Sequence, residues 1–107
     1  MQKAVTLWEE YAHLIEPFVE KDPEDTTSLS LLAYAFERKG DVLARYQKDG
    51  ETFGQSDSSR LRAALASYQE SDLRRQRILQ LDGTNQNHID GEKTLAAKIS
   101  RLIANLD

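Results

Sequence analysis

The sequence of 107 residues has no cysteine, only two prolines and only five glycines. Without cysteine, neither a disulfide bond nor a thiolate zinc site can form. Few prolines and glycines favour a small number of long elements. No apolar stretch approaches the roughly 20 residues that span a bilayer, and no basic segment followed by an apolar run marks a signal peptide. We therefore expect a protein that does not enter the membrane and that works in the cytoplasm.

The residues that are present indicate one folded domain with an uneven charge. Hydrophobic residues make up 39% of the chain and charged residues 30%, which is too apolar for disorder. The net charge of −4 argues against a generic nucleic-acid coat protein. Residues 9–25 hold seven acidic side chains and one lysine, whereas residues 60–77 hold five arginines and two acidic side chains. This polarity would join subunits head to tail, or it reflects two solvated faces.

Apolar residues recur at spacings of three and four along most of the chain, which is the pattern of amphipathic helices. The pattern predicts an all-α, four-helix bundle-like domain built around a long antiparallel helical hairpin. The single domain would span residues 1–107, with helices at about 3–16, 26–48, 58–81 and 90–106. A chain of this length buries a modest core, and oligomerisation is one way to add buried area.

Local signals set the expected helix ends. Pro17 disfavours helical geometry at the preceding residue, so the first helix should end near residue 16. Asp25 and the three hydroxyl residues after it offer capping oxygens for the second helix. Gly40 lies inside that helix and would mark a kink or a break, but we favour a continuous helix to about residue 48 because the apolar stripe resumes in phase, with Gly50 as its stop. Asp90 is the expected cap of the fourth helix.

The residues of known catalytic and cofactor sites are missing. The two histidines, His13 and His88, lie on a predicted helix and in a polar loop, with no nucleophile or metal ligands at a recognisable spacing. Residues 82–87 lack the glycine that a calcium loop needs at its sixth position. Residues 50–54 lack the lysine of a phosphate-binding loop. We therefore predict a protein with no enzymatic activity, no metal and no cofactor.

The third predicted helix carries the candidate binding residues. Arg60, Arg74 and Arg77 would project from one face, and arginine suits phosphate because its fork donates two hydrogen bonds. This face would bind duplex DNA weakly and in a salt-sensitive way, or it is simply solvated. Asp72 and Arg75 interrupt the apolar stripe of the same helix. They would fix register through an intrahelical or interchain ion pair, or form a charged binding spot.

Residues 5–80 resemble the helical region of phage terminase small subunits, of the type paired with HNH-endonuclease packaging systems. The shared pattern is a tryptophan-bearing helix, an acidic and threonine-rich cap, a long helix of Leu-x-x-x-Tyr-Ala character and a second, arginine-rich helix. Its residues are Leu7-Trp8-Glu9-Glu10-Tyr11, Pro23-Glu24-Asp25-Thr26-Thr27-Ser28, Leu29, Leu32-Ala33-Tyr34-Ala35, Val42, and residues 61–81. The resemblance implies a homo-oligomeric, ring-forming and non-catalytic protein of the host cytoplasm. Such a protein would help to select viral DNA and would regulate a large ATPase-nuclease subunit.

The alternative is a small helical adaptor or inhibitor protein, for example a phage-encoded one, that acts through protein–protein contacts. A tetratricopeptide repeat does not fit, because Ala44 lies one position early for the small residue of that motif and no second repeat follows at about 34 residues.

Overall fold

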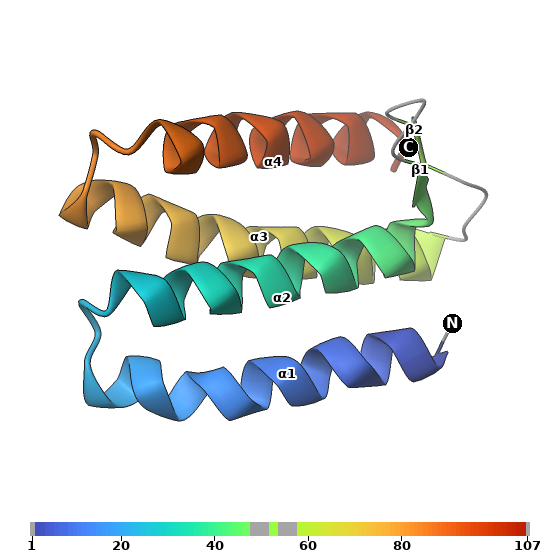
Figure 1. The fold of residues 1–107 in the computed structure, drawn as a ribbon. Coiled ribbons are helices and arrows are strands. Elements are labelled where there is room, and N and C mark those ends of the chain that lie inside the picture. The colour runs from blue at the N-terminus through green and yellow to red at the C-terminus, as the bar shows by residue number, and fades with distance from the viewer. Residues whose placement is uncertain (1, 48–51, 54–57, 107) are drawn as a thin grey trace.

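The computed structural model describes residues 2–47, 52–53 and 58–106. Within these residues the chain forms four helices: α1 (Gln2–Lys21), α2 (Thr26–Ala44), α3 (Ser58–Leu81) and α4 (Gln86–Ala104). The predicted all-α fold is confirmed. Helices α2 and α3 form the central antiparallel hairpin, and α1 and α4 lie on opposite sides of it (Figure 1). Both chain ends lie at the same end of the bundle as the short antiparallel pair β1 (Tyr46–Gln47) and β2 (Thr52–Phe53).

The hydrophobic core has two parts, one for each flanking helix. The first joins α3 and α4 to the end of α2, with Tyr68, Leu95 and Leu102 fully buried. The second lies between α1 and α2 around Ala12 and Leu32, and includes half-buried aromatic residues of both helices. Each flanking helix therefore has its own set of apolar contacts with the hairpin.

Helix α2 runs unbroken through Gly40, as the sequence predicted. The ring of Tyr68 on α3 fills the space beside this glycine, and a Cβ atom at position 40 would lie 2.6 Å from the ring carbons. Glycine at this position therefore lets the two hairpin helices approach closely enough to bury the tyrosine.

Helix α1 passes through Pro17 and ends at Lys21, so the expected end near residue 16 is wrong. Proline removes one backbone donor and crowds the preceding turn. Its ring points to solvent here, while Ile15 and Val19 on either side pack against the core between α1 and α2. Apolar burial on both sides of the proline outweighs the local disfavour and keeps the chain helical.

Two other expected helix ends are also wrong. Helix α2 ends at Ala44, where Arg45 adopts the left-handed conformation (φ 53°, ψ 46°) and its N–H caps the carbonyls of Asp41 and Val42. The expected stop at Gly50 lies outside the described residues. Helix α4 begins at Gln86 rather than at residue 90, because the Asn85 side chain accepts hydrogen bonds from the first free amides and caps the helix.

The predicted start of α2 is confirmed. Asp25 is its N-cap, with the carboxylate accepting from the backbone N–H of Ser28 at 3.1 Å and from the Ser28 hydroxyl at 2.7 Å. These hydrogen bonds, the hydroxyl one foremost, lower the pKa of Asp25 because they favour the ionised carboxylate.

Candidate interaction surfaces

Charged side chains from three helices meet inside the bundle around Lys98 of α4. The Lys98 ammonium donates to Glu37 Oε2 at 2.7 Å and to the two carboxylate oxygens of Asp41 at 3.0 and 3.1 Å. Glu37 and Asp41 lie one helical turn apart on α2 and so face the same neighbour. Burial alone would lower the pKa of Lys98, but the hydrogen bonds and charges of the two carboxylates raise it.

Helix α3 completes this buried network. Arg75 donates to Glu37 Oε1 at 2.8 Å, and the Tyr68 hydroxyl donates to Asp41 Oδ1 at 2.6 Å. The two carboxylates are thus paired with the Lys98 ammonium and the Arg75 guanidinium, and the exposed Arg38 guanidinium lies 3.6 Å from Asp41 Oδ2. Buried charges that are paired and hydrogen-bonded in this way hold elements in one arrangement, and breaking one pair strands another charge. We interpret the network as the means by which α4 is fastened to the hairpin.

A second polar contact between α3 and α4 consists of two carboxyl groups. Burial, together with the hydrogen bond to Asp72 and the charge of Asp72, raises the pKa of Glu92 to about 8. Glu92 is therefore protonated at neutral pH. Among the described side chains, Glu92 Oε2 has no hydrogen-bond partner although it is buried. Gly91 next to it lies against the Arg75 guanidinium, where a Cβ atom would come within 2.5 Å of Nη1.

The structure places the candidate register residues Asp72 and Arg75 on different neighbours. Arg75 reaches across to Glu37 of α2, while Asp72 accepts a hydrogen bond from Gln76 and faces Glu92 of α4. Each therefore contacts a different helix of the same chain. The described residues contain no cluster of three or more histidine and acidic side chains arranged to hold a metal ion.

The three candidate binding arginines differ in their surroundings. Arg74 pairs with Glu70 and lies over the Phe36 ring, 5.0 Å from its centroid. Arg77 is exposed and makes a hydrogen bond of 3.3 Å to Gln80. Arg60 is half-buried near the start of α3. Arg77 is thus the most accessible of the three for a phosphate group.

An apolar ridge runs along the outer face of α1. We define it as Leu7, Leu14 and Phe18, which are 63%, 70% and 59% exposed. Their spacing of seven and four residues places them on one side of the helix. The neighbouring face of α2 exposes Leu31 and Tyr34, and the Tyr34 ring lies edge-on to that of Trp8 with centroids 5.5 Å apart. Large exposed apolar side chains gathered on one helix face make this face a candidate interaction surface.

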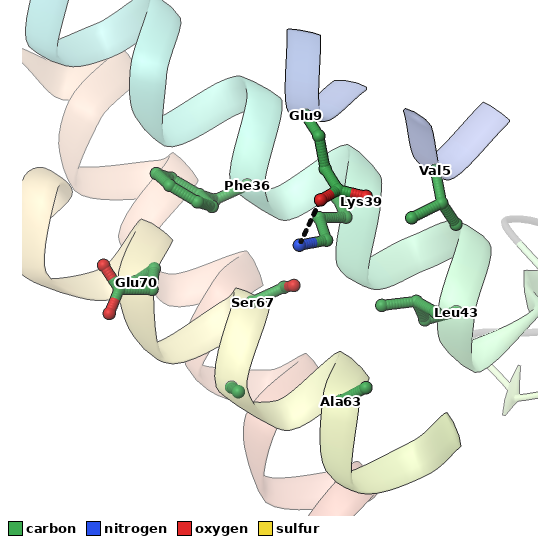
Figure 2. A pocket seen from close by; sticks show the side chains of 9 residues that line it. Val5, Glu9, Phe36, Lys39, Leu43, Ala63, Ser67 and Glu70 are labelled. Carbon is green, nitrogen blue, oxygen red and sulfur yellow. Dashed lines mark ion pairs between the residues drawn. The ribbon is translucent and has the colours of Figure 1, made fainter. Parts of the chain in front are cut away.

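An open groove lies on the other side of α1, between α1, α2 and α3 (Figure 2). Its volume is about 400 Å³. Phe36 and Leu43 of α2 form an apolar floor, and the α3 wall has small side chains. An ion pair of 3.8 Å between Glu9 of α1 and Lys39 of α2 bridges the groove. The full lining is Val5, Glu9, Phe36, Lys39, Leu43, Ala63, Ala66, Ser67 and Glu70.

The sequence contained signals for the ridge and the network that periodicity alone did not resolve. Leu7 and Leu14 widen the apolar stripe of α1 beyond what one neighbouring helix can cover, which is the mark of a second packing face. Lys98 lies between Leu95 and Leu102 at spacings of three and four, a core position occupied by a charge. A charge at such a position requires a buried partner of opposite sign.

Comparison of the chain with protein-family models, with curated proteins and with solved structures finds no match. Within the described residues, none of the helices combines the length and apolar character needed to cross a bilayer.

Proposed function

We propose that this protein has no catalytic role and works by associating with other macromolecules, first of all with further copies of itself. The observation that carries this proposal is the ridge of Leu7, Leu14 and Phe18. Large apolar side chains with more than half of their surface in water favour a contact that removes them from it. A chain of 107 residues also gains buried area by self-association.

Self-association is tested by light scattering after gel filtration at micromolar protein concentration. We expect a mass above that of the monomer for the unchanged chain and a monomer for Leu14→Glu, since burying an unpaired charge in an apolar contact is unfavourable. Thr6→Glu adds the same charge to α1 away from the ridge and should leave the mass unchanged. A monomeric unchanged chain would contradict the proposal.

The form of this function that we propose is DNA packaging of the terminase small-subunit type. Three features support it. Trp8 lies on a helix that precedes the hairpin, Asp25 caps the long helix α2, and α2 and α3 run antiparallel, as the resemblance implies. The arginines of α3 give this helix a positive balance, which suits the phosphate backbone.

This DNA-binding role makes its own prediction. Arg77→Glu should weaken retention of duplex DNA because it replaces the most accessible of the candidate arginines with a repelling charge. Lys93→Glu makes the same change of charge on α4 and should have a smaller effect. Retention is measured by gel shift at several salt concentrations. If the unchanged chain retains no DNA even at low salt, DNA binding is wrong and self-association still stands.

The second candidate is an adaptor or inhibitor that binds a different protein through the same ridge. The engagement of Arg74 with Glu70 and Phe36 favours it, because this arginine is already occupied. The adaptor would be a monomer or a dimer without salt-sensitive DNA retention, so the DNA measurement above separates the candidates.

A further inference from the structure

Over its described length, residues 58–81, the side of α3 that faces water carries no fully exposed acidic residue, although the chain has a net charge of −4. Its exposed polar side chains are two arginines, three glutamines and two serines. The two acidic residues of the helix are engaged within the fold, Glu70 with Arg74 and Asp72 on the side toward α4. Helix α1, by contrast, exposes Glu10 and Glu20. The exposed face of α3 is therefore positive.

The exposed residues of α3 include a continuous row, which we call the α3 stripe. Arg62, Ala66, Gln69, Leu73 and Gln76 follow one another at alternating spacings of four and three, which places them on one line along the helix. The buried residues of α3 lie on the opposite side and pack against α2 and α4. At 1.5 Å per residue, the stripe is about 21 Å long. Helix α3 thus presents a long, narrow edge that points away from the core.

The middle of the α3 stripe has side chains that recognise the edges of base pairs. The amide of glutamine both donates and accepts, and it forms two hydrogen bonds with the N6 and N7 atoms of adenine. Leu73 lies between Gln69 and Gln76 and is 62% exposed, and an apolar side chain in such a place packs against the methyl group of thymine. Over the described length of α3 it is the one large apolar side chain that is exposed, whereas the centre of a protein–protein interface is mainly apolar. The stripe therefore suits base-pair edges better than a protein surface.

We propose that α3 enters the major groove of duplex DNA and reads its bases with Gln69, Leu73 and Gln76. This inference rests on the DNA binding proposed above and adds to it the readout of sequence and the residues that perform it. The major groove is about 12 Å wide and admits an α-helix. Because the groove winds around the duplex, a long helix lies deepest in it near the middle of the contact. The middle of the stripe therefore meets the bases, and the ends of the exposed face meet the phosphates.

The ends of the exposed face carry the charge that attracts DNA. Arg62 and Arg77 are exposed, and neither forms an ion pair within the described part of the chain. Arg77 makes a hydrogen bond of 3.3 Å to the neutral side chain of Gln80. The two arginines are 15 residues apart, or roughly 22 Å along the helix, so that the reading residues lie between them. Contacts of arginine with phosphate fix the position of a protein on the duplex without reading its sequence.

The readout is tested with the full chain and a library of duplexes of random sequence. We expect the duplexes retained after several rounds of selection to share a short motif that includes A·T pairs. The double variant Gln69→Ala with Gln76→Ala should lower the preference for this motif over a scrambled duplex by roughly tenfold or more, while its retention of the scrambled duplex stays the same. Gln2→Ala with Gln86→Ala removes two exposed glutamines from α1 and α4 and is the matched control.

Arg62→Glu distinguishes a phosphate contact from a base contact. It should weaken retention of the motif and of the scrambled duplex by similar factors, because a phosphate contact does not depend on sequence. The substituted side chains are all exposed, so the thermal midpoint of unfolding should stay unchanged in each variant.

The outcomes separate this inference from the DNA binding on which it rests. If the unchanged chain retains DNA in a salt-sensitive way but no motif emerges, readout by α3 is wrong and binding to the DNA backbone stands. A preference that survives in the double variant Gln69→Ala with Gln76→Ala also overturns α3 as the reading helix. If the unchanged chain retains no DNA at low salt, DNA binding is wrong and readout with it, and the α3 stripe is then a contact for protein.

Discussion

The two helices that flank the hairpin, α1 and α4, are attached to it in different ways. Helix α4 combines apolar packing with the buried charges around Lys98, and its large exposed apolar residues number only one, Ile103. Helix α1 is attached mainly through apolar and aromatic contacts, with one half-exposed ion pair between Glu9 and Lys39, and it exposes the three residues of the ridge. Paired charges fix one geometry, whereas apolar contact is non-directional. Helix α4 is therefore held in one position on the hairpin, whereas α1 exposes apolar surface to solvent.

Among the predicted effects on the attachment of α4, we expect the largest from removal of the charge at Lys98. Lys98→Met leaves Glu37 and Asp41 buried without their shared cation, and we expect it to lower the free energy of unfolding by about 3–5 kcal/mol. Urea denaturation measures this loss. Hydrogen exchange should show that the protection of α4 falls more than that of α1, because the network joins α4 to the hairpin and includes no residue of α1.

Lys93→Met is the matched control for this substitution. Lys93 lies on the exposed side of the same helix, and surface charges of this kind contribute about 0–1 kcal/mol. If Lys98→Met costs no more than the control, the attachment of α4 rests on its apolar contacts and does not differ in kind from that of α1.

The sequence predicted the parts of this fold that depend on periodicity and local capping. The bounds of α3 at residues 58 and 81, the Asp25 cap and the passage of α2 through Gly40 all follow from such signals. The predicted end of α1 was wrong because burial of Ile15 and Val19 outweighs the local effect of Pro17 on the helix. The left-handed Arg45 carries no local signal, since glycine or asparagine is usual at that position.

The candidate site was less predictable, because it depends on which helices become neighbours. Arg75 interrupts an apolar stripe that is visible in the sequence, but its partner Glu37 lies 38 residues away. The groove is formed by three helices, and no single stretch of sequence contains it. The ridge is the exception, because a stripe wider than one neighbour can cover is visible in α1 alone.

The contact between Glu92 of α4 and the hairpin should make the attachment of α4, but not that of α1, depend on pH. The folded protein holds the pKa of Glu92 at about 8, above its ordinary 4.5. The carboxyl therefore contributes fully to stability below pH 4.5, and this contribution is lost as the pH rises toward 8, because the folded state keeps the proton that the unfolded chain releases. Glu92→Gln keeps a hydrogen-bonding group but cannot ionise. At pH 9 we expect the variant to be more stable than the unchanged chain by roughly 1 kcal/mol, with little difference at pH 4.

Thermal unfolding of both chains across this range measures the effect, and hydrogen exchange at each pH locates it. Gln in place of Glu92 should protect the first turns of α4 at pH 9 and leave the exchange of α1 unchanged. The charged groups that face Glu92 all belong to the hairpin: Asp72 and Arg75 of α3, and Glu37 of α2. If the stability of the unchanged chain and that of Glu92→Gln depend on pH in the same way, Glu92 ionises in the folded state without a loss of stability. Attachment of α4 would then depend on Lys98 and the apolar core alone, and alkaline pH would not distinguish it from the attachment of α1.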